Sequence, residues 1–124
     1  MKIEVSNGEI VDKFTILQIK LAKITDSEKL KYVQKEHAYL EKQVKQIGVE
    51  EEYIQKLHFI NYKLWNIEDA IRLKEQSQEF DESFIQLARR VYITNDKRAA
   101  IKKEINITTE SEFCEVKQLP NLYK

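Results

Sequence analysis

The chain has 124 residues, and its 21 Lys and Arg balance 21 Asp and Glu, so the formal net charge at pH 7 is zero. A chain without net charge has no overall field that would attract nucleic acid or an anionic membrane, and we expect neither as a partner. Charged residues make up 34% of the chain, which has only two Gly and one Pro, and this composition favours long helices over sheets and turns.

The first predicted helix spans residues 7–24. Ser6 precedes it and Glu9 follows three residues later, which is the spacing of a capping box at a helix N-terminus. Its apolar residues recur at alternating intervals of four and three, so they form a single stripe that consists of Ile10, Phe14, Leu17, Leu21 and Ile24.

The second predicted helix spans residues 26–47. Thr25 and Glu28 offer another capping box, with Asp26 and Ser27 as competing caps. We expect Gly48 to end this helix, because glycine adopts the left-handed backbone conformation freely. The short link between the first two helices makes them antiparallel neighbours.

The third and fourth predicted helices span residues 50–76 and 81–107, and Asp81 is the expected N-cap of the fourth. The segment 108–124 holds no helical phase for long and contains Pro120, so we expect an irregular tail. The alternating spacing predicts near-parallel axes with coiled-coil packing. Together these patterns predict an all-α fold, an antiparallel four-helix bundle that forms one domain over residues 1–124.

Polar residues form a second stripe beside the apolar one on the third predicted helix. This stripe, at intervals of four and three, consists of Asn61, Trp65, Glu68, Arg72 and Glu75, with Asp69 beside it. On the fourth helix one face carries Asn95, Arg98 and Lys102, and a second face carries Arg89, Tyr92 and Asp96. Arg98 falls within the apolar stripe, so its charge needs a partner.

These residues allow two interpretations. One is a salt-bridge network that fixes helix pairing, in which Glu68 and Asp69 face Arg98 or Arg89 and Arg72 faces Asp96. The other is a pocket for an anionic small molecule, with basic side chains as ligands, Trp65 or Tyr92 as an aromatic wall, and Glu68 or Asn95 to orient the ligand. The candidate ligand-binding residues are Lys13, Trp65, Glu68, Asp69, Arg72, Arg89, Tyr92, Asn95, Asp96 and Arg98.

Several chemistries lack the residues that they require. His37 and His58 are isolated and no ExxH pair exists, so we expect no metal and no other cofactor. There is no Gly-rich phosphate loop. The ExxD pair at Glu9 and Asp12 precedes every ExxE, which is the wrong order for a helical nucleotide pyrophosphohydrolase. An enzyme of the chorismate mutase kind, which needs only electrostatic preorganisation, stays open by analogy of fold class.

The cysteine count and the character of the apolar segments indicate the cellular compartment. Cys114 is the one cysteine, so no disulfide is expected and a reducing compartment fits. Acidic residues interrupt the N-terminal segment, which argues against a signal peptide, and no apolar run is long enough to cross a membrane. We therefore expect a cytoplasmic protein.

Three segments resemble the motifs of a family of small all-helical bacterial and phage proteins of unknown function: GEIVDKFTIL, LWNIEDAIR and NDKRAAIK. The resemblance covers most of the chain and implies an all-helical cytosolic protein, with some relatives near genes for surface-polysaccharide synthesis. It attaches no catalytic role to the matching positions, which are Asp12, Lys13, Trp65, Glu68, Asp69, Arg72, Asn95, Asp96 and Arg98.

The function expected from the sequence is that of a helical interaction or accessory protein that self-associates as a homodimer. Apolar residues that lie off the stripes suggest more surface to bury than one small bundle hides, and these are Tyr32, Tyr39, Phe59, Tyr62 and Ile93. The alternative is a small helical enzyme or binder of an anionic metabolite, with the polar residues as its site.

Overall fold

The computed structural model describes residues 1–114. It contains four α-helices: α1 at Asn7–Lys23, α2 at Ser27–Ile47, α3 at Glu51–Gln76 and α4 at Glu82–Thr108. Each helix begins and ends within one residue of its predicted bounds, and residues 1–114 contain no strand, so the all-α fold is confirmed. Of the predicted irregular tail, residue 108 still belongs to α4, and residues 115–124 lie outside the described part.

The helix ends follow the local chemistry of the sequence. The Ser6 hydroxyl accepts a hydrogen bond from the Glu9 backbone N–H at 3.1 Å, and Asp26, one of the competing caps, accepts two from the first turn of α2. Gly48 ends α2 with a φ of 73°, a conformation that favours glycine. Asp81 caps α4 as predicted.

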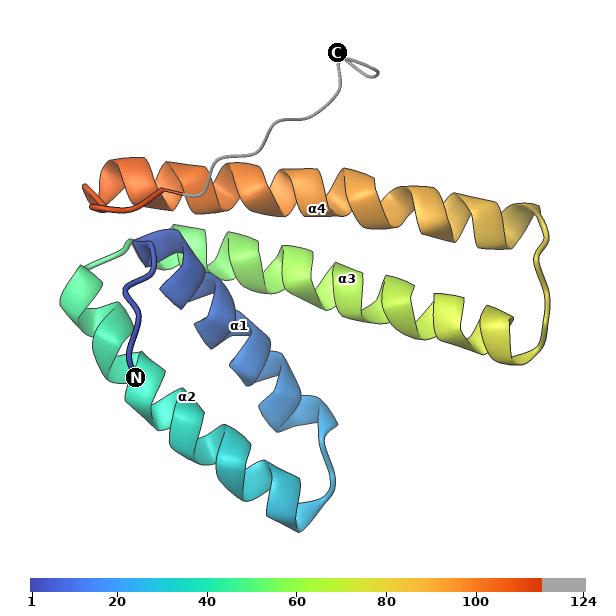
Figure 1. The fold of residues 1–124 in the computed structure, drawn as a ribbon, viewed down its shortest axis with the longest axis horizontal. Helices are drawn as coiled ribbons and strands as arrows, with labels where there is room; N and C mark the ends of the chain where they lie inside the picture. Colours follow the sequence, from blue (N-terminus) through green and yellow to red (C-terminus); the bar gives the residue numbers. More distant parts are fainter. Residues whose placement is uncertain (115–124) are drawn as a thin grey trace.

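The four helices form two hairpins that meet at one end. α3 and α4, with 26 and 27 residues, lie side by side and run in opposite directions over about 40 Å (Figure 1). α1 lies across one end of this hairpin and contacts both of its helices, while α2 folds back beside α1 (Figure 1). The α1–α2 hairpin therefore projects at an angle from the α3–α4 hairpin, and α1 is the helix that joins the two.

The apolar core lies where all four helices converge. One cluster of buried residues there consists of Val11 and Phe14 from α1, Val44 from α2, Leu57 from α3 and Ile105 from α4. Because α1 stands between α2 and the α3–α4 hairpin, it buries residues on more than one face. None of the described helices has the length and apolar character needed to cross a membrane.

The far part of the α3–α4 hairpin lies beyond α1 (Figure 1). We call residues 68–93 the distal hairpin, which comprises the end of α3, the turn and the start of α4. Not one of these 26 residues is buried, although 11 of them are apolar. The five most exposed of the large apolar residues are Leu73, Phe80, Ile85, Tyr92 and Ile93, with exposed fractions of 39–64%.

We predict that Leu57→Ala lowers the free energy of unfolding by about 2–5 kcal/mol, because Leu57 is fully buried where the four helices meet. Urea unfolding followed by circular dichroism measures the loss. Ile107→Ala is the matched control, since the Ile107 side chain is 64% exposed and its truncation leaves no cavity. Equal losses for the two variants would contradict this location of the core.

Candidate functional site

A buried carboxylate lies at the contact between α1 and the α3–α4 hairpin. Asp12 of α1 is 1% exposed. Arg98 of α4 donates to it through two nitrogens, Nε to Oδ1 at 2.9 Å and Nη2 to Oδ2. Asn61 of α3 donates from Nδ2 to the same Oδ1 at 2.8 Å. A carboxylate buried this deeply requires compensation, and the two-point guanidinium contact provides it in a fixed geometry.

Two further side chains complete this network. The Thr15 hydroxyl donates to the Asp12 carbonyl at 2.7 Å and accepts from Asn61 Nδ2 at 2.9 Å. Asn95 Oδ1 accepts from Arg98 Nη1 at 3.5 Å. We call these five residues the junction, because they come from α1, α3 and α4 and fix the three helices together. Within residues 1–114 no buried side-chain nitrogen or oxygen lacks a hydrogen-bond partner.

A second set of contacts ties the start of α1 to the end of α4. Lys102 Nζ donates to Glu9 Oε2 at 2.6 Å, so the Glu9 carboxylate forms an interhelical ion pair. The Gly8 backbone N–H donates to Asn106 Oδ1 at 2.7 Å, and Asn7 Nδ2 donates to Thr109 Oγ1 at 3.0 Å. A Cβ atom on Gly8 would lie 2.5 Å from the Lys102 carbonyl oxygen. The two helices therefore approach as closely as they do because position 8 is glycine.

The structure brings together some of the candidate residues and separates others. Asn95 and Arg98 belong to the junction, and Asp96 is half-buried next to them. Lys13 is exposed and pairs with Glu36 of α2 at 3.8 Å, so its side chain is turned toward α2.

The remaining candidates lie along the α3–α4 hairpin beyond the junction. Trp65 is half-buried, and the other five, which are exposed, are Glu68, Asp69, Arg72, Arg89 and Tyr92. Arg98 forms an ion pair with Asp12. That ion pair links α1 with α4, and Asp12 is a partner for Arg98 that neither interpretation of the sequence had named.

The sequence interpretation missed a second buried stripe of α1, which carries the junction residues Asp12 and Thr15. Gly8, Asp12, Thr15 and Ile19 recur at intervals of four, three and four, and all four are buried. This second stripe of α1 faces the α3–α4 hairpin, whereas the predicted apolar stripe includes residues that pack on α2. Small and polar residues at helical spacing are the signal, and they are hard to distinguish from a solvent-exposed face without the neighbouring helices.

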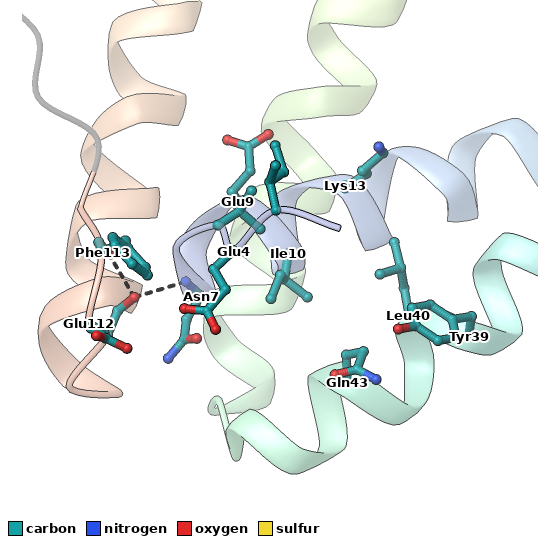
Figure 2. A pocket seen from close by; sticks show the side chains of 13 residues that line it. Glu4, Asn7, Glu9, Ile10, Lys13, Tyr39, Leu40, Gln43, Glu112 and Phe113 are labelled. Carbon is teal, nitrogen blue, oxygen red and sulfur yellow. Dashed lines mark hydrogen bonds between the residues drawn. The ribbon is translucent and has the colours of Figure 1, made fainter. Parts of the chain in front are cut away.

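Three grooves on the described surface are lined by residues outside the junction. One groove of about 630 Å³ lies between the N-terminal segment, α1, α2 and the segment after α4 (Figure 2). It has apolar walls such as Ile10 and Leu40 and a polar rim that includes Lys13. A second groove of about 690 Å³ lies between α1 and α3, and a third of about 450 Å³ lies beside the α3–α4 turn. None of these three grooves is lined by Trp65, Arg72 or Arg98.

Three charged side chains form ion pairs at the α3–α4 turn. Lys74 Nζ donates to Glu79 and Asp81 at 3.1 Å each, and these carboxylates raise the pKa of Lys74. The Phe84 backbone N–H and then Lys74 lower the pKa of Asp81. An acid whose pKa is lower in the folded than in the unfolded state stabilises the fold at pH values above its unfolded-state pKa. The stabilisation from Asp81 is therefore present at neutral pH, and it is lost as the pH falls through the folded-state pKa of Asp81.

The described residues contain no group of three or more His, Cys, Asp or Glu side chains placed to hold a metal ion. His37, whose spacing matches the apolar stripe of α2, stacks on Phe14 with ring centroids 4.8 Å apart.

The fold and the junction define a small all-α protein of two helical hairpins held together by a buried polar network. The chain belongs to DUF6165, a family of unknown function, whose model matches residues 1–121. No curated protein and no solved structure matches the chain.

We predict that the Asp12–Arg98 pair makes a large, non-additive contribution to stability. Arg98→Met leaves Asp12 buried without its cation and should cost about 3–5 kcal/mol. The double variant D12N/R98M removes the charge together with its partner, and its loss should fall short of the sum of the single losses by about 1–3 kcal/mol. Urea unfolding of the four proteins at one protein concentration gives the coupling energy. Additive losses would show that the pair does not hold α1 in place.

We predict that Gly8→Ala destabilises the protein by about 1–3 kcal/mol, because the new methyl group meets the Lys102 carbonyl oxygen of α4. Intrinsic helix propensity predicts the opposite sign, a gain of up to about 1 kcal/mol. The midpoint of thermal unfolding decides between the two. A raised midpoint would contradict the close approach of α1 and α4.

Proposed function

We propose that this protein is a helical interaction protein that acts by self-association, most simply as a homodimer. The observation that carries the proposal is the distal hairpin, in which 11 of 26 residues are apolar and none is buried. Two helices alone cannot enclose a core, because each keeps most of its circumference in water. A second pair of helices supplies the missing surface.

The same arrangement explains why the junction is so heavily paired. The hydrogen bonds of Asp12 with Arg98 and Asn61 form only when α1 has one orientation on the α3–α4 hairpin. They therefore fix the angle between the two hairpins. We propose one domain over residues 1–124, in which α1 and α2 form the base and the distal hairpin is the surface that binds. Such a protein needs no chemistry of its own and fits an accessory role in the cytoplasm of a bacterium or a phage-infected cell, and the motif resemblance supports that setting.

A second candidate function is binding of an anionic metabolite at the edge of the junction. Its support is that the Arg98 side chain remains 27% exposed and that Arg72 and Arg89 are exposed on the neighbouring stretches of α3 and α4. Trp65 and Tyr92 would then provide the aromatic wall. A thermal-shift screen of anionic metabolites and sugar nucleotides tests it, since a ligand that binds the native state raises the unfolding midpoint. A hit that survives R72A/R89A would rule out this location.

We predict that the protein elutes as a dimer of about 30 kDa, twice the 14.8 kDa of the chain, in size-exclusion chromatography with light scattering. Ile85→Gln should weaken the dimer about tenfold, because Ile85 is a 49% exposed apolar side chain on the distal hairpin. Ile107→Gln is the matched control, as Ile107 is 64% exposed at the opposite end of α4. A clean monomer at the highest attainable concentration would refute self-association.

A further inference from the structure

The groove of about 630 Å³ joins parts of the chain that are far apart in the sequence (Figure 2). Ile10 of α1 lies between its two sides (Figure 2). One side is formed by Glu112 and Phe113, and the other by Tyr39 and Leu40 of α2 (Figure 2). Ligand pockets in proteins commonly enclose about 300–1,000 Å³, so the groove has the size of a binding site.

Hydrogen bonds and an ion pair hold the walls of this groove in place. The Ser111 hydroxyl accepts from the Asn7 backbone N–H at 3.0 Å and donates to the Phe113 carbonyl at 2.8 Å, which attaches the segment after α4 to the start of α1 (Figure 2). Between α1 and α2, Lys13 pairs with Glu36 at 3.8 Å. A partner therefore meets a groove that is already formed, and this lowers the entropic cost of binding.

The groove exposes apolar surface. Ile10 and Leu40 are half-buried and connect it to the core. Four further lining residues are large apolar side chains with exposed fractions of 40–79%, namely Ile3, Val5, Tyr39 and Phe113. Contiguous exposed apolar surface with a polar rim is typical of a site that binds another molecule.

The lining of the groove carries more negative than positive charge. Its charged side chains are Glu4, Glu9, Lys13 and Glu112. Glu9 is already paired with Lys102, and Lys13 with a glutamate of α2. The ion pairs within residues 1–114 include neither Glu4 nor Glu112, and both are exposed. The groove therefore offers two carboxylates to a positively charged partner, and an anionic one would be repelled.

The N-terminal segment adds backbone groups to this site. No backbone–backbone hydrogen bond in the described part of the chain includes residues 1–5, whereas Ile3, Glu4 and Val5 line the groove. An extended peptide pairs its own backbone with such groups while its side chains enter neighbouring pockets. This favours a peptide over a small organic cation, which has no backbone to pair.

We propose that this groove binds an extended segment of a partner protein that combines apolar residues with a Lys or Arg. The apolar side chains of the segment pack on Ile10 and Phe113, and its basic side chain pairs with Glu4 and Glu112. The residues that line the groove include none of the distal hairpin, so this binding is independent of the proposed self-association.

A selection from random peptides tests the proposal on the full chain. The probe is a phage-displayed library of peptides of about seven residues, which reach about 23 Å when extended. The selected peptides should be rich in Lys or Arg and in apolar residues. Synthetic copies labelled with a fluorophore give the dissociation constants by fluorescence anisotropy.

Charge reversal at the groove should weaken the binding of a selected peptide. E4K/E112K, at two exposed positions, should raise its dissociation constant at least about tenfold, because like charges then meet in the groove. The control is E75K/E104K, which changes the net charge by the same amount at exposed positions that line none of the three grooves. It should bind the peptide like the wild type.

A second pair of variants tests the apolar part of the groove. I3S/F113S removes two exposed apolar side chains from its lining and should also weaken the peptide at least about tenfold. Ile107→Ser is the control, since Ile107 is exposed on α4 and lines none of the three grooves. Circular dichroism should give the same helical content for all variants.

Each possible outcome supports or overturns this assignment. A peptide rich in basic and apolar residues that is weakened by both groove variants and by neither control supports it. A selection without binders, a preference for acidic peptides, or binding that E4K/E112K leaves unchanged overturns it. Displacement of the peptide by equimolar spermidine, which has positive charge without apolar side chains, would assign the groove to a small cation and also overturn it.

Discussion

The contact between Asp12 and Arg98 is the constraint on which the rest of the structure depends. A carboxylate that is 1% exposed is tolerable only with a cation and hydrogen-bond donors in fixed positions, and Arg98 and Asn61 provide these from two different helices. The consequence is geometric as much as energetic, because the two-point guanidinium contact defines both the register and the orientation of α1 on the α3–α4 hairpin. The Lys102–Glu9 pair and the close approach at Gly8 hold the same helix one turn further along.

This constraint makes α1 a central helix. It packs on α2 with one face and on α3 and α4 with another, so the chain is two hairpins joined through a shared helix (Figure 1). Two of the segments that stand out in the sequence, GEIVDKFTIL and NDKRAAIK, meet at this contact and supply Asp12 and Arg98. The third, LWNIEDAIR, runs from the edge of the junction into the distal hairpin, where its charged residues are exposed. One structural explanation, the contact between α1 and α4, therefore covers the first two segments and not the third.

The distal hairpin connects the structure to the proposed function. Within residues 68–93, 11 residues are apolar and none is buried, so this part of the α3–α4 hairpin leaves apolar surface exposed. The proposed self-association would cover that surface with helices of a second chain. Binding of a small anion would instead use the residual exposure of Arg98 at the edge of the junction, where much of the arginine's hydrogen-bonding capacity is already committed to Asp12.

The sequence by itself determined the local structure. Capping residues such as Ser6 and Asp81, the glycine at position 48 and the spacing of apolar residues define four helices to within one residue, because these signals act over one or two turns. It also placed Arg98 within an apolar stripe, which marked it as a residue that needs a partner. The tertiary structure decided which partner. The pairing with Asp12 links positions 86 residues apart, and no periodicity within one helix shows which face of α1 will meet α4. It also decided that α1 buries two faces while the distal hairpin buries none, since burial depends on how the hairpins cross and not on the pattern of any single helix.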